Sequence, residues 1–516
     1  MSHGLPALWP LVLATAGPAL VEPADPARPQ TPLRFEVRVA RKIAPRDGRL
    51  FVVLGKADGP EPRFSLGHTG LDAPPALARD VVGLDTGKVA VLDATVATFP
   101  IDSLGQLPAG DYNAQAVFHS NPDLNLPNAP GDLYGPTRRL TIDPAKGGIV
   151  ALELSEQVPA ETMPAETDLV KFVKLESKLL SKFHGRPISL RAGIILPRDF
   201  ARETDRRYPL RVHIGGYGAR YTGVSGRMRE GSAFRRAWMA DEAPRMILVQ
   251  LDGAGPLGDP YQVNSANHGP YGDAITRELI PYIEATYRGI GAGQARVLDG
   301  GSTGGWVSLA LQVFYPDFFN GCWSSCPDSV DFRDLQLVNI YEDGNAYLNA
   351  DGFERPAARL LNGDVKYTMS HELQMENLLG RRDSWTLSGG QWGAWNATYG
   401  PRSADGRPAP LWNPKTGRID RSVVDHWKRY DLRLILDRDW KTLGPRLRGK
   451  IHVYVGEADD YFLNNAVHRL SDSLSRATDP PFDGVIRFGP GKGHCWCEIG
   501  EEEMMKQMAE RFEGKK

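Results

Sequence analysis

The stretch RVLDGGSTGGWVSLALQVFY, residues 296–315, decides the fold. Its apolar start, 296–298, indicates a short strand, and the run after Gly304 indicates an apolar helix that stops before Pro316. Between them, GGSTG at 300–304 matches the pattern G-x-S-x-G. That pattern places a serine on a sharp turn, where small flanking residues let the strand and the helix pass closely. We therefore predict that Ser302 is a nucleophile; the alternative is a glycine-rich turn without a chemical role.

Strand and helix patterns alternate on both sides of this turn, from residue 168 to residue 516. Alternation of this kind predicts an α/β fold, a mostly parallel sheet with helices on both faces. In the predicted helix 273–287 we expect Asp273 to be the N-cap and Pro281 to kink or restart the helix. The predicted strands are 188–196, 210–214, 246–251, 296–298, 451–455 and 485–488, and a closing helix is predicted over 501–512.

The first third of the chain has a different pattern. Residues 33–158 hold short alternating strands separated by Gly, Pro and Asp, which predicts an N-terminal β-sandwich domain, and 159–167 reads as a linker. His68 and His119 are isolated there, so we expect surface or packing roles. Residues 1–32 form a leader and linker, whose apolar part favours a cleaved signal peptide and a periplasmic or secreted protein. No basic residue precedes that part and prolines interrupt it, so the alternative is a disordered extension on a cytoplasmic protein.

A Trp-rich insertion is predicted at about 338–440. It holds six of the chain's 11 tryptophans, which argues against disorder, and long inserts in compact domains are usually functional. We expect it over or near the edge of an active site, where tryptophans could stack on an aromatic acyl group or a sugar; the alternative is that they are core residues.

Partners for Ser302 are predicted from the order Ser, acid, His. His494 follows the last strand on a glycine-rich loop and is the expected general base, whereas His452 lies in a strand and His468 in a helix. His371 and His426 fall in the insertion and could line the pocket.

The expected acid is Asp459, which follows the strand 451–455 and would orient the histidine. Asp460 is the alternative acid, and Asp328 and Asp331 are less favoured candidates (outsiders).

An oxyanion hole is expected from two backbone N–H groups. One belongs to Thr303, directly after the nucleophile. The other belongs to Tyr217 in the loop IGGYG, 214–218, with Gly216 as the alternative donor. A tight turn that happens to be glycine-rich is the competing interpretation.

The chain has four cysteines, Cys322, Cys326, Cys495 and Cys497. One or two disulfides, or buried free thiols, fit this number, and the spacing is a poor match to zinc sites. We hypothesise that Cys326 and Cys495 form a disulfide that pins the histidine loop. The formal net charge of −2 with mixed signs gives no basic footprint for nucleic acid and no polybasic membrane patch, and no apolar run predicts stable membrane insertion.

Five segments together resemble the putative-esterase group of α/β-hydrolases, which includes esterase D-like enzymes, feruloyl esterases and enterochelin esterases. They are YPLRVHIGGYG (208–218), GGSTGGW (300–306), YPDFFNGCWSSCPDSVDF (315–332), GEADDYFLNNAV (456–467) and GHCW (493–496). The resemblance runs from residue 171 to the C-terminus. It implies a serine hydrolase without metal or cofactor, with Ser302, Asp459 and His494 as catalytic residues. Relatives commonly have His-Gly where this chain has IGGYG, and the insertion is long for the group. The N-terminal region resembles small Ig-like modules.

We therefore expect a serine esterase that hydrolyses a carboxylic acyl ester, in a small molecule or linked to carbohydrate, through an acyl-enzyme intermediate. Feruloyl and acetyl esters of carbohydrate are candidate substrates. One alternative is a prolyl oligopeptidase-like serine peptidase, although the N-terminal region is short for a propeller. Another is a catalytically idle binding protein, which an intact set of three residues argues against. The sequence predicts no oligomeric state.

Overall fold

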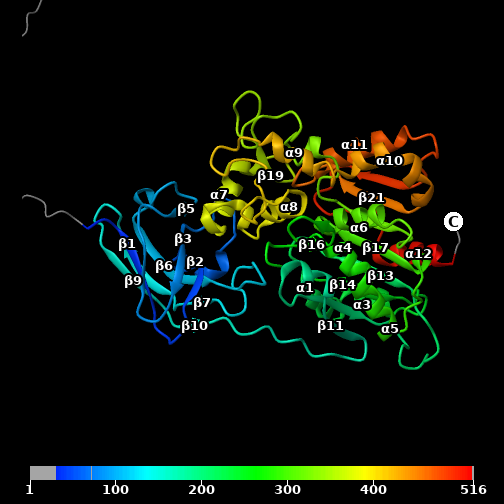
Figure 1. Ribbon diagram of the computed structural model, residues 1–516, viewed down its shortest axis with the longest axis horizontal. Helices are drawn as coiled ribbons and strands as arrows, with labels where there is room; N and C mark the ends of the chain where they lie inside the picture. Colours follow the sequence, from blue (N-terminus) through cyan, green and yellow to red (C-terminus); the bar gives the residue numbers. More distant parts are fainter. Residues whose placement is uncertain (1–30, 71, 514–516) are drawn as a thin grey trace, which may run out of the picture.

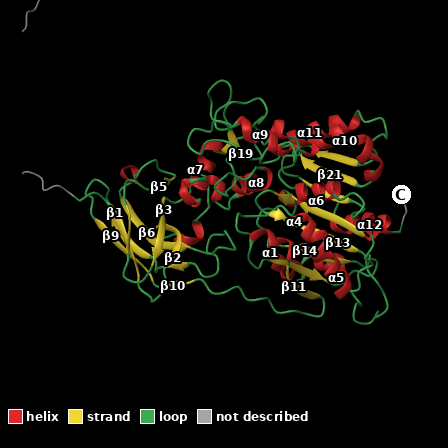
Figure 2. Cartoon of the chain, viewed as in Figure 1, coloured by secondary structure: helices red, strands yellow, loops and turns green. Residues whose placement is uncertain are grey.

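A computed structural model describes residues 31–70 and 72–513 (Figures 1 and 2). The apolar segment on which the export prediction rests lies outside the described residues. The strands are β1 Arg34–Val39, β2 Arg46–Lys56, β3 Ala76–Leu84, β4 Val89–Leu92, β5 Ala97–Phe99, β6 Gly110–His119, β7 Leu133–Tyr134, β8 Arg138–Ile142, β9 Ile149–Leu154, β10 Glu156–Gln157, β11 Val170–Glu176, β12 Ser189–Ile195, β13 Leu210–Ile214, β14 Ile247–Leu251, β15 Asn264–Ser265, β16 Gly269–Pro270, β17 Arg296–Gly301, β18 Cys322–Ser325, β19 Pro356–Arg359, β20 Val365–Thr368, β21 Ile451–Gly456 and β22 Val485–Gly489. The α-helices are α1 Lys178–His184, α2 Val224–Arg227, α3 Ala233–Met239, α4 Tyr271–Ala274, α5 Ile280–Thr286, α6 Thr303–Phe314, α7 Met369–Leu379, α8 Gln391–Tyr399, α9 Arg421–Trp427, α10 Leu432–Leu447, α11 Leu463–Ser475 and α12 Glu501–Phe512.

The strands β1 to β10 form two sheets that share one hydrophobic core. One sheet has the order β4-β1-β9, and the other runs β10-β7-β6-β2-β3-β5 with β8 paired to β6. Phe35 of the first sheet and Leu50 of the second are both fully buried in this core. Alternating apolar residues therefore meet between the two sheets, as the sequence pattern predicts for a sandwich. The Ig-like topology remains a prediction.

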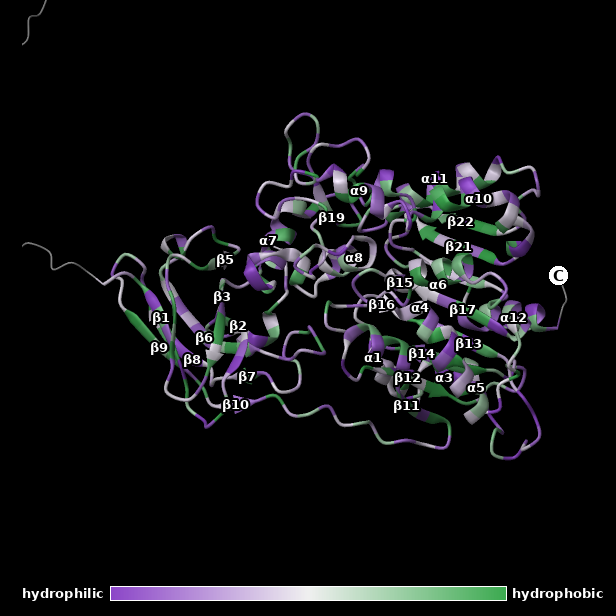
Figure 3. Ribbon diagram, in the orientation of Figure 1, coloured by the Kyte–Doolittle hydropathy of each residue, from purple (hydrophilic) through white to green (hydrophobic). Residues whose placement is uncertain are grey.

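The large sheet has the order β11-β12-β14-β13-β17-β18-β21-β22. The pairs β11·β12 and β12·β14 are antiparallel, and the pairs from β14 to β22 are parallel. Two hydrophobic clusters lie against this sheet, one containing α6 and the other containing α12. Nearly every residue of α6 is buried, and Figure 3 shows this helix as largely hydrophobic. The predicted α/β class is confirmed, and the parallel strands bring their carboxyl ends to one edge of the sheet.

The helix predicted over 273–287 differs in detail from the expectation. It begins at Tyr271, with Pro270 at the N-cap, so the prediction that Asp273 caps it was wrong. A π-helical segment, Ile275–Leu279, follows and leads without a break into α5, with Pro281 near its start. The expected restart at Pro281 is therefore absent, because Leu279 and Ile280 keep helical backbone angles.

The segment 338–440 packs between the N-terminal sheets and the large sheet (Figure 1). Its helix α7 contacts β3 and β5. Arg49 of β2 is buried and donates hydrogen bonds from Nε to Leu378 O at 2.7 Å and from Nη2 to Asp383 at 2.7 Å. The N-terminal sheets and the insertion are therefore joined by a buried polar contact.

No helix within 31–70 and 72–513 is both long and apolar enough to span a membrane.

Candidate active site

Ser302 lies at the sharp turn between β17 and α6. Its backbone has φ 57° and ψ −123°, a conformation that costs a non-glycine residue free energy. The surrounding glycines permit this turn because a Cβ at Gly304 would collide with the carbonyl oxygen of Ile214, and one at Gly300 with that of Gly304. The structure therefore holds the serine in the strained position that the sequence pattern predicts.

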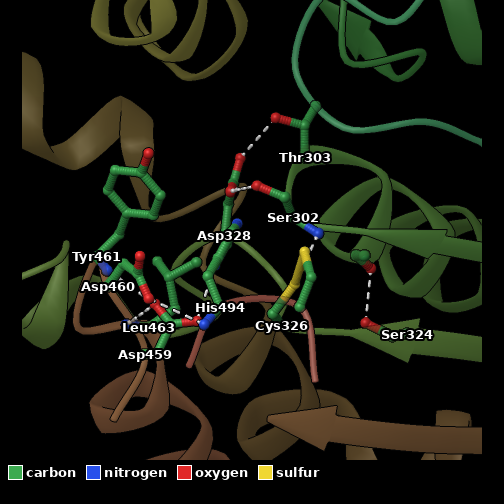
Figure 4. The surroundings of a disulfide bond; sticks show 12 residues. Ser302, Thr303, Ser324, Cys326, Asp328, Asp459, Asp460, Tyr461, Leu463 and His494 are labelled. Carbon is green, nitrogen blue, oxygen red and sulfur yellow. Dashed lines mark hydrogen bonds and ion pairs between the residues drawn. A yellow bond between two sulfur atoms is a disulfide. The ribbon is translucent and has the colours of Figure 1, made fainter. Parts of the chain in front are cut away.

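His494 and Asp459 are paired, as the sequence predicts. His494 Nδ1 is 2.8 Å from Asp459 Oδ2 (Figure 4). Asp459 follows β21 and is fully buried, and its other oxygen, Oδ1, accepts hydrogen bonds from the backbone N–H of Tyr461 at 2.9 Å and of Leu463 at 3.3 Å. A carboxylate fixed in this way holds the ring in one orientation, with Nε2 left to accept a proton.

Asp460, the alternative acid, has a different contact. Its Oδ1 accepts a hydrogen bond from the backbone N–H of His494 at 3.0 Å. It therefore positions the loop that carries the histidine, and the imidazole ring itself is held by Asp459.

Asp328, one of the two outsiders for the acid, lies beside the nucleophile. Ser302 Oγ donates a long hydrogen bond of 3.5 Å to Asp328 Oδ1, and no hydrogen bond between Ser302 and His494 is present among the described residues (Figure 4). In unliganded enzymes the contact between nucleophile and base is often long and tightens with substrate. Asp331, the other outsider, points elsewhere and forms ion pairs with Arg333 and Arg433.

The second oxygen of Asp328, Oδ2, is the centre of a buried hydrogen-bond cluster. Its four donors are Tyr261 Oη at 2.7 Å, Thr303 Oγ1 at 3.0 Å, Trp395 Nε1 at 3.0 Å and Gln391 Nε2 at 3.1 Å. Burial raises the pKa of Asp328 above its ordinary value, against the effect of these donors. The cluster joins the start of α6 to the insertion, and no sequence motif marks it because its members are far apart along the chain.

Electrostatics at His494 favour its protonated form. Burial alone would lower the pKa of this histidine, but the hydrogen bond and charge of Asp459, together with Asp328 and Asp460, raise the pKa above its ordinary value. The imidazolium that forms when a histidine accepts a proton is therefore stabilised here by nearby carboxylates.

The loop after β13 lies next to the nucleophile, where the second oxyanion donor is expected. A Cβ at Gly216 would lie 3.9 Å from Ser302 Cβ, so this loop approaches the serine closely. Gly218 N–H donates to Asp259 Oδ2 at 3.1 Å, and Tyr217 Oη donates to Gly389 O in the insertion. These contacts hold the loop in place, while the N–H groups of Gly216 and Tyr217 have no hydrogen-bond partner among the described residues.

A disulfide joins Cys326 to Cys495, as hypothesised from the sequence. Cys326 is buried and its Sγ accepts a hydrogen bond from Ser302 N–H at 3.1 Å, whereas Cys495 directly follows His494 and is exposed. The disulfide therefore connects the nucleophile turn to the histidine loop (Figure 4). Cys322 and Cys497 are free thiols.

A buried ion network supports the strand that leads to Ser302. Asp299 of β17 forms a two-point ion pair with Arg211 of β13, at 2.8 and 2.9 Å, and its Oδ2 is 2.8 Å from His213 Nδ1. Burial alone would raise the pKa of Asp299, but the charge of Arg211 and the contact with His213 hold it well below its ordinary value. Glu501 of α12 also pairs with Arg211.

Ser302, His494 and Tyr217, three of the predicted site residues, line one cavity of about 270 Å³. Its wall is made by the nucleophile turn, the histidine loop and the insertion. The lining residues are Tyr217, Ser302, Asp328, Gln336, Tyr367, Glu372, Gln391, Trp395, Tyr461, Leu463 and His494. The insertion thus lies at the edge of the site, but only one of its tryptophans, Trp395, reaches this cavity. Trp385, Trp392, Trp412 and Trp427 are buried, so most of this aromatic content is core.

The other histidines lie elsewhere. His452 is in β21 and stacks on Trp323, and His468 is in α11 and pairs with Glu457. His371 accepts a hydrogen bond from Gly70 N–H, and neither it nor His426 lines the cavity with Ser302.

Cys326, His494 and Cys495 lie close enough together for a metal ion. Their sulfurs are joined in the disulfide, and His494 Nδ1 faces Asp459, so this group does not offer the thiolates that a metal site of this composition needs.

Residues 187–496 match the family described as Putative esterase. No curated protein sequence matches the chain. Solved structures with similar folds include a ferulic acid esterase, with 17% identity, TM-score 0.40, and coverage of 66% of this chain and 98% of that one. A fluorophosphonate-binding serine hydrolase from Staphylococcus aureus has 13% identity, TM-score 0.38, and coverage of 66% and 98%. A dipeptidyl peptidase 4 from Porphyromonas gingivalis has 11% identity, TM-score 0.37, and coverage of 86% and 46%.

Proposed function

The chain belongs to the Putative esterase family of hydrolases, and from this premise we propose that it is a serine esterase that hydrolyses carboxylic acyl esters through an acyl-enzyme intermediate. The observation that carries the proposal is the single cavity that holds Ser302 at a strained turn together with His494, which is paired to a buried carboxylate.

In the proposed reaction, Ser302 Oγ attacks the ester carbonyl carbon and its proton passes to His494 Nε2. The carbonyl oxygen becomes an oxyanion and accepts hydrogen bonds from the N–H of Thr303 and from that of Tyr217 or Gly216. When the carbon–oxygen bond breaks, His494 returns the proton to the leaving alcohol. Water then attacks the acyl-enzyme with His494 as base, and the carboxylic acid leaves with Ser302 regenerated.

The substrate we propose is an ester of a small molecule or a carbohydrate, with feruloyl and acetyl esters as the first candidates. Aromatic side chains on the cavity wall, Tyr217, Tyr367, Trp395 and Tyr461, support an aromatic or sugar group close to the reacting ester. Polar groups of Gln336 and Gln391 on the same wall suit the hydroxyls of such a group.

Hydrolysis of p-nitrophenyl acetate tests this function. We expect activity in the wild type, its loss in Ser302→Ala, and its retention in Ser475→Ala, which removes an exposed hydroxyl of α11. Equal activity of wild type and Ser302→Ala would contradict the proposal, because a different group would then carry the reaction.

A peptidase and an idle binding protein are the competing functions. The N-terminal strands form two sheets around one core, not the repeated blades of a propeller. We therefore expect no Ser302-dependent cleavage of glycyl-prolyl p-nitroanilide. Cleavage of that amide faster than of the acetate ester would favour the peptidase, and inactivity toward both would favour the binding protein.

A further inference from the structure

A second cavity, of about 340 Å³, lies between the N-terminal sheets and the insertion. From the N-terminal side it is lined by Phe51 and Val117 of the sheet and by two loops, 66–69 and 125–128. From the other side it is lined by α7 and by the loop 388–391. Since both parts of the chain supply walls, this cavity does not exist in the 168–516 segment alone.

The second cavity adjoins the cavity that holds Ser302. Tyr217, Glu372 and Gln391 line both, so the two share a wall. Tyr217 belongs to the loop that we propose as the source of an oxyanion donor, and its Oη donates to Gly389 O, which lines the second cavity. Tyr217 thus stands at the boundary of the two cavities, and an acyl group that passed this boundary from the reacting carbonyl would enter the second cavity.

The walls of the second cavity are mainly apolar. Phe51, Leu66, Val117, Met375 and Leu379 supply hydrocarbon and aromatic surface. Burial raises the pKa of Glu372 to about 7 and that of Glu376 to about 8, so the cavity disfavours negative charge on both carboxyl groups. Binding of an apolar group in this cavity is therefore favourable, whereas a charged group would pay the free energy of losing its hydration.

The cavity is fixed by hydrogen bonds across its rim. Asn125 Nδ2 donates to Leu387 O at 3.1 Å, and Asn125 N–H donates to Gly255 O at 3.0 Å. Gly389 packs so closely on Asn125 that a Cβ there would lie 2.5 Å from the Asn125 carbonyl oxygen. The loop 125–128 is therefore held against both the insertion and the large-sheet part of the chain.

We propose that this second cavity binds the apolar end of the substrate's acyl group, so that the N-terminal β-sheets complete the ester-binding site. The proposal rests on the proposed esterase function. His494 protonates the leaving alcohol, so the alcohol must lie beside this histidine. Because His494 lines the first cavity but not the second, we assign the acyl group to the second cavity. The ligand class is a medium-chain or arylalkyl carboxylic acid in ester linkage.

The test compares acyl groups on one leaving group. For p-nitrophenyl acetate and p-nitrophenyl octanoate, the ratio of kcat/KM, octanoate to acetate, is measured in wild type, Leu379→Trp and Leu126→Trp. These variants fill the second cavity from opposite sides, and neither residue lines the first. Val82→Trp, which adds an indole at an exposed site of β3, is the control.

We expect the ratio to fall by about tenfold or more in each filling variant, the loss expected when a few methylenes lose their apolar contact, and to be unchanged in the control. Equal ratios in all four folded proteins would overturn the proposal. So would a selective loss along a series of acetate esters with larger alcohols, because the cavity would then hold the alcohol.

A binding experiment separates this proposal from the esterase function itself. Calorimetric binding of p-nitrophenyl octanoate to Ser302→Ala needs no turnover. Addition of Leu379→Trp to this variant should weaken binding by about tenfold, on the same apolar contact. Unchanged binding would overturn the second-cavity proposal even if Ser302 proves to be the nucleophile, and weakened binding would support it even if hydrolysis fails.

Discussion

His494 Nδ1 lies 2.8 Å from Oδ2 of Asp459, a carboxylate with no exposed surface. The neighbouring acid, Asp460, reaches only the backbone N–H of the same histidine. Two adjacent carboxylates thus make different contacts, one with the imidazole ring and one with the backbone of its loop. Substitution of each should therefore affect kcat differently.

Asp459→Asn should lower kcat for p-nitrophenyl acetate by roughly a thousandfold to ten-thousandfold, since an amide does not favour the tautomer that accepts the serine proton. KM should change far less. Asp460→Asn is the matched control and should retain most of kcat, because it alters a contact to the backbone. Similar losses in both variants would contradict the assignment of the acid.

The pH profile should depend on Asp328. Hydrolysis needs neutral His494, so kcat/KM falls as pH drops through the pKa of this histidine, which nearby carboxylates raise. Asp328→Asn removes one of the negative charges that favour the imidazolium. The pKa of His494 then falls, and the acid limb of the profile should move to lower pH.

The control for this shift is Asp472→Asn, which removes an exposed carboxylate of α11. Its acid limb should coincide with that of the wild type. An acid limb in Asp328→Asn that stays in place, or moves to higher pH, would show that Asp328 does not act on His494 through its charge.

Loss of the disulfide should reduce stability and activity together. It closes a long loop, with a sequence separation of 169 residues, and links the turn of Ser302 to the loop of His494. Cys326→Ala should lower the free energy of unfolding by about 2–5 kcal/mol and also lower kcat. Cys497→Ser alters a free thiol and should do neither. Urea unfolding and ester hydrolysis, with and without reductant, measure both effects. If reductant changes neither the stability nor the activity of the wild type, this prediction is contradicted.

The buried ion pair of Arg211 and Asp299, which joins β13 to β17, should contribute to the free energy of unfolding. Arg211→Met leaves the charge of Asp299 without its two-point partner, and removal of one member of a buried pair costs about 3–5 kcal/mol. Arg446→Met breaks a pair with Asp317 at the surface and should cost at most about 1 kcal/mol. Urea unfolding of the two variants compares them directly, and equal losses would contradict this difference.

The sequence predicts local geometry well where one short motif contains it. The turn at Ser302, the placement of His494 after the last strand, and the placement of Asp459 after β21 each depend on neighbours within a few residues. The order Ser, acid, His then joins these motifs, and the structure places Ser302 and His494 on one cavity, with Asp459 paired to the histidine.

Features that depend on packing between distant segments are not predictable in this way. Asp328 accepts hydrogen bonds from Tyr261, from Thr303 of α6 and from two residues of α8, whereas the sequence indicates it only as a less favoured candidate for the acid. The N-cap of the helix after β16 was also predicted wrongly at Asp273, because Pro270 starts the helix earlier and a π-helical segment follows. The second cavity has walls from residues about 300 positions apart, so no sequence pattern marks it.

The most direct test of the central claim is covalent labelling with a fluorophosphonate, followed by intact-mass measurement and peptide mapping. An activated serine attacks phosphorus, whereas ordinary serines do not. We predict one adduct per chain, located on Ser302 and absent from Ser302→Ala. An unlabelled folded protein, or an adduct on another residue, would contradict the claim that Ser302 is the nucleophile of a serine esterase.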